Sequence, residues 1–212
     1  MIWPMSHAPL LFDLDGTLLD TLGDLADAAN AARGALGMAP LADERIAPHI
    51  GWGLGHLLSH VLPSSHRRHL AAAREIFMAH YAAHLLVRST PYPGAEALMA
   101  RRGARFVGLV TNKPLRFVTP ILERLHWRFD VVVAGDTLSE RKPDPAPIHH
   151  ALHGVAGAED ARFIGDSEVD LAAAQAAGVM FLGVSWGRVA GLGVPCIDRL
   201  DAALDWRPAI SC

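Results

Sequence analysis

The stretch LLFDLDGTLLD, from Leu10 to Asp20, opens with an unbroken apolar run and then places two aspartates on either side of a single leucine. The apolar run is typical of a strand that is buried on both faces of a sheet. Asp13 and Asp15 follow this run, and Gly16 lets the chain turn there. Two carboxylates so close together repel each other unless a cation or a proton neutralises one of them. The stretch therefore indicates a functional site at the end of a buried strand.

Further apolar runs with the same character recur along the chain, and helical patterns lie between them. Alternating strands and helices favour a parallel sheet with right-handed crossovers, so we expect an α/β fold with a Rossmann-like core. Pro120 interrupts the first of these helical patterns, and we expect that helix to begin late or to kink. The expected strands lie at residues 105–112, 129–136, 162–167 and 178–187, and the expected helices at 115–126, 145–155 and 169–177.

The segment 21–90 departs from the alternation, because it contains helical patterns and no convincing strand. These patterns cover residues 24–37, 55–62 and 64–86, the last with Ser64 or Ser65 as its N-cap. From residue 91 the alternation resumes, with a helix that Gly103 ends. We therefore expect an α/β core formed by residues 1–20 and 91–212, and an inserted all-helical cap formed by residues 21–90.

The composition limits the class of protein. The chain has 212 residues, of which 51% are hydrophobic, and its net charge is -3. No basic stripe is present, which argues against a nucleic-acid partner, and no apolar stretch is long enough to predict a membrane span. Cys196 and Cys212 form no disulfide framework, and the first residues lack the pattern of a secretory signal. We expect a cytoplasmic protein, either a monomer or a homodimer.

Polar residues follow the expected strands, at the sheet edge where ligands bind in open parallel sheets. Carboxylates without thiolates suit a hard cation such as Mg²⁺, while lysine, hydroxyl and amide donors suit a phosphoryl group. A carboxylate can also attack phosphorus and form an aspartyl-phosphate. The residues in question are Asp13, Asp15, Thr17, Thr111, Asn112, Lys113, Lys142, Asp166, Ser167 and Asp170.

Four short motifs carry a resemblance to a known family. They are DLDGT at 13–17, TNK at 111–113, KP at 142–143 and GDSEVD at 165–170, and they occur in the family's order at the expected strand ends. With them the chain resembles the phosphatases of the haloacid-dehalogenase-like superfamily, and it is most similar to phosphoglycolate phosphatases. The resemblance covers nearly the whole chain.

The resemblance implies a role for each carboxylate. Asp13 would be the nucleophile and a ligand of Mg²⁺. Asp15 would protonate the leaving alkoxide and then activate water, and its main-chain carbonyl would also bind the metal. Asp166 would be a further metal ligand, and Asp170 would support the metal site from the next helical turn. The alternative is that Asp170 acts only on the dipole of its own helix, and we favour the supporting role.

The remaining motif residues are implied to bind substrate. Thr111 and Asn112 would hold the transferring phosphoryl group, and Lys142 would neutralise its charge and orient Asp13. Lys113 either reaches the substrate or lies at the rim of the cleft. Trp52, in the glycine-rich stretch APHIGWGL, either walls the substrate pocket or is buried in a turn between helices.

These residues predict a Mg²⁺-dependent phosphatase that hydrolyses a small phosphate monoester, first of all phosphoglycolate, through an aspartyl-phosphate. The alternatives are a phosphatase of another small metabolite, such as a sugar phosphate or an amino-sugar acid phosphate, and a phosphomutase of the same superfamily. A cap over the nucleophile would exclude water and carry the specificity.

The chain also contains 12 histidines, most of them in the expected cap. His56 and His60 lie one helical turn apart, as do His80 and His84, and this spacing occurs in zinc sites. The sequence shows no convincing third and fourth ligand beside either pair. We therefore expect these histidines to form half-exposed helix faces and no metal site.

Overall fold

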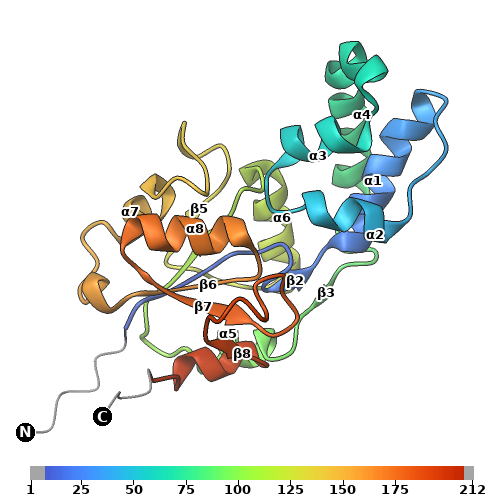
Figure 1. Ribbon diagram of the computed structural model, residues 1–212. Helices are drawn as coiled ribbons and strands as arrows, with labels where there is room; N and C mark the ends of the chain where they lie inside the picture. Colours follow the sequence, from blue (N-terminus) through green and yellow to red (C-terminus); the bar gives the residue numbers. More distant parts are fainter. Residues whose placement is uncertain (1–7, 208–212) are drawn as a thin grey trace, which may run out of the picture.

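The computed structural model describes residues 8–207, so Cys212 and the first seven residues lie outside it. Six parallel strands form one sheet in the order β5-β4-β1-β6-β7-β8, with β1 near the middle (Figure 1). The expected α/β fold is confirmed, and a short sixth strand that the sequence did not predict extends one edge. The strands are β1 (Leu10–Phe12), β4 (Val107–Val110), β5 (Val131–Val133), β6 (Arg162–Gly165), β7 (Met180–Val184) and β8 (Cys196–Ile197).

Successive residues of β1 face opposite sides of the sheet, and both sides are covered. Leu11 packs into a cluster with residues of α7 (Ala146–Leu152) and α8 (Glu168–Ala177). Leu10 and Phe12 belong to a second cluster, with residues of α5 (Ala95–Arg101), α6 (Leu115–Leu125) and the 3-10 turn η4 (Leu200–Leu204). Burial on both faces explains why the strands are apolar throughout.

Two short strands mark the place where the chain leaves the core and returns to it. β2 (Leu19–Asp20) pairs antiparallel with β3 (Thr90–Pro91), and the segment between them contains helices only. We call residues 22–83 the cap; they lie to one side of the sheet (Figure 1). The cap comprises α1 (Leu22–Ala35), α2 (Asp43–Ile46), η1 (Ala47–His49), α3 (Leu54–Val61), η2 (Ser64–His69) and α4 (Leu70–Ala83).

One local expectation was wrong, and one of two alternatives is excluded for another helix. The stretch 64–86 is not one helix with a serine cap, because it opens as the 3-10 turn η2 and becomes α-helical only at Leu70. The amide of His66 donates to the carbonyl of Pro63 at 2.8 Å, which is the tight bonding of a 3-10 turn. α6 begins at Leu115 rather than late, and Pro120 lies inside it.

A buried carboxylate fastens the cap to the segment that returns to the core. Asp24 of α1 is 2% exposed and accepts hydrogen bonds from the amides of residues 87–89. These bonds satisfy backbone donors that no helix or strand uses. In residues 8–207, none of the helices has both the length and the apolar character that crossing a membrane requires.

Candidate active site

A buried lysine lies between two buried aspartates at the carboxyl end of β1. Nζ of Lys142, in the loop after β5, is 2.9 Å from Oδ1 of Asp13 and 2.7 Å from Oδ1 of Asp170. All three residues are at most 3% exposed. Charges are tolerated at such depth only when they are paired, so the position of each of these side chains depends on the other two.

Asp166 follows β6 and brings a third carboxylate to the same place. One carboxylate oxygen from each of Asp13, Asp166 and Asp170 lies within 4.8 Å of the other two. The hydroxyl of Thr17 donates to Oδ1 of Asp166 at 2.9 Å. Gly16 has a φ of +87°, and a Cβ there would lie 2.8 Å from the Asp166 carboxylate. The turn after Asp15 therefore requires glycine both for its backbone conformation and for the space beside Asp166.

Burial shifts the proton affinity of these carboxyl groups. Loss of water, with the nearby charges of Asp170 and Asp15 adding to it, outweighs the attraction of Lys142 and raises the pKa of Asp13 to about 6. Burial and the neighbouring carboxylates raise the pKa of Asp166 well above its usual range. A divalent cation among these groups would relieve both effects.

The residues present fit a hard divalent cation such as Mg²⁺. The donors are carboxylate oxygens, with no thiolate or imidazole among them. Asp170 has both oxygens engaged, Oδ1 by Lys142 and Oδ2 by the amide and hydroxyl of Ser167, which caps α8. Oδ2 of Asp166, by contrast, accepts no hydrogen bond from the residues that the structure describes and lies 3.9 Å from the guanidinium of Arg188.

Asp15 is held by a second buried lysine. Nζ of Lys113 is 2.8 and 3.1 Å from the two carboxylate oxygens, and the hydroxyl of Thr21 donates to Oδ1 at 2.7 Å. The ring of Tyr81, from α4 of the cap, covers the ammonium with its centroid at 4.5 Å. Burial lowers the pKa of Lys113, but Asp15 and Tyr81 raise it more, so that the net shift is upward. Lys113 is therefore a charged, buried group and no part of the rim of the cleft.

The chain has only two lysines, Lys113 and Lys142, and both are buried in this site. Every other basic side chain apart from the histidines is an arginine. Lysine presents a compact point charge on a flexible stem, which suits a group that must stay close to different anions in turn.

The side-chain amide of Asn112 fixes the backbone that carries Lys142. Its Nδ2 donates to the carbonyls of Lys142 and Gly51, each at 2.9 Å, and its Oδ1 accepts from the amide of Lys142 at 3.1 Å. The bond to Gly51 also ties the core to the cap. The neighbouring Thr111 is 4% exposed, and its hydroxyl accepts from the amide of Lys113 at 3.3 Å.

A cavity of about 40 Å³ lies where these groups meet the cap. A volume of this size holds on the order of three water molecules. The core lines one side of the cavity with polar groups, and the cap lines the other with mostly apolar ones. The core side consists of Asp13, Asp15, Thr111, Asn112, Lys113, Pro114 and Phe117, and the cap side of Leu25, His49, Ile50, Gly51, Gly53, Leu54, Leu57, Phe77 and Tyr81.

Comparison with known proteins assigns the chain to a family. Residues 10–184 match the family described as haloacid dehalogenase-like hydrolase. The chain belongs to the haloacid dehalogenase-like hydrolases.

Relatives of this hydrolase share most of its length. It is 39% identical to a phosphoglycolate phosphatase of Chromobacterium violaceum over 189 residues, which are 83% of this chain and 84% of that protein. It is 37% identical to a plasmid-encoded phosphoglycolate phosphatase of Cupriavidus necator over 204 residues, which are 92% of this chain and 88% of that protein.

A solved structure shares the arrangement of the whole hydrolase. The crystal structure of a predicted phosphoglycolate phosphatase from Haemophilus somnus superimposes with a TM-score of 0.86 at 25% identity, covering 95% of this chain and 99% of that one. The expected family and the phosphatase type of hydrolase are thus confirmed.

The structure brings together the predicted site residues that belong to the four motifs. Trp52 is the exception among the predicted site residues, because it neither lines the cavity nor belongs to the cluster of carboxylates and lysines beside it. Its side chain is 41% exposed, and its ring stacks on His56 with the centroids 5.2 Å apart. Trp52 is therefore neither a wall of this cavity nor a buried core residue of the hydrolase.

Sequence reasoning missed several neighbours of the site. Trp186 donates from Nε1 to the carbonyl of Gly16 at 3.0 Å, and Arg188 donates to the carbonyl of Ile50 in the cap at 3.2 Å. Both follow β7, so the rule that strand ends meet at one edge would have indicated them. Tyr81 carried no such signal, because it belongs to a helix far along the chain from the motifs.

Proposed function

We propose that this hydrolase cleaves a small phosphate monoester, first of all phosphoglycolate, in a Mg²⁺-dependent reaction through an aspartyl-phosphate on Asp13. The observation that carries the proposal is the buried position of Lys142 between Asp13 and Asp170, next to Asp166. It supplies a nucleophilic carboxylate, a fixed cation and a set of metal-binding oxygens in one place.

In the first half-reaction a carboxylate oxygen of Asp13 forms a bond to phosphorus while the bond from phosphorus to the ester oxygen breaks. Asp15 gives its proton to the departing alkoxide. The ammonium of Lys142 and the hydroxyl of Thr111 balance the charge on the phosphoryl oxygens. The products are the free alcohol and phosphorylated Asp13.

In the second half-reaction Asp15 takes a proton from water, and the water oxygen bonds to phosphorus. The bond between phosphorus and Asp13 breaks, which releases inorganic phosphate and restores the carboxylate. The same group acts as acid and then as base, as required when one residue serves both steps. Lys113 and Thr21 keep Asp15 in position during both steps.

Mg²⁺ would be held by Asp13, Asp166 and the main-chain carbonyl of Asp15, with Asp170 as a supporting carboxylate. Its chemistry is to neutralise the negative charge of the phosphoryl oxygens. Lys142 and Ser167 each bind one oxygen of Asp170, so this carboxylate is held in place. Its fixed position is consistent with an indirect role at the metal site.

The size and charge of the cavity favour a small substrate that carries a second anionic group besides its phosphate. The space between cap and core is narrow, and Lys113 places a second cation beside Asp15. Phosphoglycolate carries a carboxylate besides its phosphate, so it can use both lysines. The names of the relatives support the same choice. A cytoplasmic location and a monomeric or dimeric state stay predictions.

A panel of phosphate esters assayed for release of inorganic phosphate tests this proposal. We expect turnover with Mg²⁺, none in excess chelator, and phosphoglycolate as the ester with the highest kcat/KM. Lys113→Met should lower kcat/KM for phosphoglycolate more than for ethyl phosphate, which lacks the carboxylate. Full turnover in excess chelator would count against a role for the metal. An equal loss of kcat/KM for both esters in Lys113→Met would count against phosphoglycolate as the substrate.

A further inference from the structure

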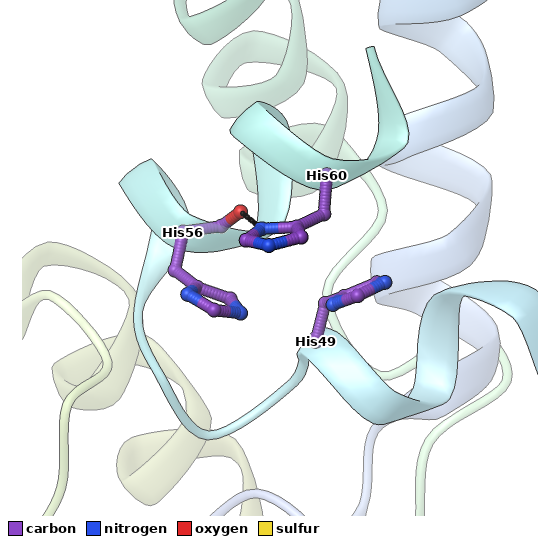
Figure 2. Close-up of side chains that lie close together, drawn as sticks. All are labelled: His49, His56 and His60. Carbon is purple, nitrogen blue, oxygen red and sulfur yellow. Dashed lines mark hydrogen bonds between the residues drawn. The ribbon is translucent and has the colours of Figure 1, made fainter. Parts of the chain in front are cut away.

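Three histidines converge on the face of the cap beside the active-site cavity. His49 ends η1, while His56 and His60 project from α3, and one ring nitrogen from each lies within 4.8 Å of the other two (Figure 2). The ring centroids of His56 and His60 are 4.0 Å apart, and those of His49 and His60 are 4.5 Å apart. His49 and His56 are half-buried and His60 is exposed, so the cluster is open to ions from solvent.

The loop between η1 and α3 brings His49, a third ligand that the sequence did not reveal, to the helical pair. His56 and His60 lie one helical turn apart and share one face of α3. Gly51 and Gly53 have φ values of +94° and +93°, which let the chain reverse within a few residues. This reversal places His49 opposite the helical pair (Figure 2).

A hydrogen bond orients one of the three rings, and burial favours the neutral form of the other two. Nδ1 of His60 lies 2.8 Å from the carbonyl of His56, and a ring that donates there keeps the lone pair of Nε2 for a metal. Burial, with the charge of His60 adding to it, lowers the pKa of His49. The pKa of His56 is lowered by burial and then by His60 and His49. Neutral imidazole is the form that ligates metals.

A second pair of histidines in the cap has the same spacing as His56 and His60 but, in the part of the chain that the structure describes, lacks a third ligand. His80 and His84 of the cap have the same spacing, with ring centroids 4.2 Å apart and Nδ1 of His84 2.8 Å from the carbonyl of His80. Among the described residues, no third histidine, cysteine or acidic ligand joins this pair within the distance that unites the first three. The second pair is therefore a natural control.

We propose that His49, His56 and His60 bind one transition-metal dication of the zinc class, separate from the carboxylate site of the core. Three imidazole nitrogens suit Zn²⁺ and its neighbours rather than Mg²⁺. Bonds of about 2.0–2.1 Å in tetrahedral geometry place the nitrogens about 3.4 Å apart. Rotation of these partly exposed rings closes the remaining distance, and water completes the coordination.

The bound metal would tie η1 to α3 across the loop that contacts the core. The carbonyl of Gly51 in this loop accepts from Asn112, and the carbonyl of Ile50 accepts from Arg188. Cross-linking the two ends of the loop reduces its freedom to leave these partners. The site therefore gives a metal of the zinc class an influence on how the cap meets the active site.

Titration of the whole protein with Zn²⁺ by calorimetry, in excess Mg²⁺ to occupy the carboxylate site, tests the proposal. We expect the protein to bind one zinc ion. His56→Gln should weaken the zinc affinity by more than about 100-fold, because losing a ligand costs more than losing a residue that only hydrogen-bonds to a ligand. His80→Gln should bind zinc as the parent does. A Co²⁺ complex of the parent should show the intense visible bands of a nitrogen-ligated site of low coordination number.

Equal zinc affinity in the parent and in His56→Gln would overturn the proposal, as would an equal loss in His80→Gln. Circular dichroism of metal-free His56→Gln checks that the variant is folded. None of these readouts depends on catalysis, so the result stands apart from that of the phosphatase assays.

Discussion

Nζ of Lys142 lies 2.9 Å from Oδ1 of Asp13, and both side chains are at most 2% exposed. The backbone of Lys142 is itself held by the amide of Asn112, so the cation is fixed before any substrate arrives. A fixed buried cation stabilises charge that develops in a reaction without having to reorganise. It also permits Asp13 to exist as an anion at a depth where burial raises its pKa.

Replacement of this cation tests its two roles together. Lys142→Met should lower kcat by about 10²–10³ or more, as the loss of a fixed electrostatic partner does. It should also reduce the free energy of unfolding by about 3–5 kcal/mol, because Asp13 and Asp170 lose their common partner. Steady-state kinetics and denaturant unfolding measure both effects. A stable variant with parental kcat would remove Lys142 from the mechanism.

Gly16 offers a test of the metal site that replaces none of the proposed ligands. A methyl group at Gly16 would press on the Asp166 carboxylate, so Gly16→Ala should raise the Mg²⁺ concentration for half-maximal activity at least about tenfold. Gly37→Ala is the matched control, since Gly37 also has a positive φ, +73°, but has nothing within 4 Å of a Cβ. The control should lose about 1–2 kcal/mol of stability, because a Cβ is strained at a positive φ, and should keep its metal requirement. Equal metal requirements in the two variants would contradict the assignment.

The raised pKa of Asp13 predicts how stability depends on pH in the metal-free protein. Its folded value of about 6 exceeds the ordinary 3.8, so between these pH values the folded state binds more protons than the unfolded state. Stability should therefore fall as the pH rises through this range, by roughly 3 kcal/mol for this group in total between about pH 3 and about pH 7. Urea unfolding in chelator measures the slope.

Asp13→Asn is the control for this slope, because it removes the titrating group. The variant should show a smaller fall in stability over the same pH range and should be the more stable protein at pH 7 without metal. Identical slopes in the two proteins would mean that Asp13 is not the group responsible.

The sequence predicted those features that short stretches encode. Unbroken apolar runs revealed five of the six strands of the main sheet, and the polar residues behind them, Asp13 and Asp166 among them, gathered as parallel topology requires. The two-residue strands β2, β3 and β8 were missed because two residues show no periodicity. Their pairing depends on neighbours that are distant along the chain.

Tertiary contacts decided the residues that the sequence left open. Lys113 is buried against Asp15 because Tyr81 closes over it from the cap, and no local pattern shows that contact. Trp52, expected in the pocket or the core, stacks on His56 instead and is 41% exposed.

The proposed mechanism requires that Asp13 becomes phosphorylated during turnover. Acid quenching of the enzyme within its first turnovers with phosphoglycolate and Mg²⁺, followed by mass spectrometry of its peptides, tests this directly. We expect one added phosphoryl group on the peptide that contains Asp13, and none in Asp13→Asn or in excess chelator. Turnover without any such adduct in the parent enzyme, or with the adduct on a different residue, would contradict it.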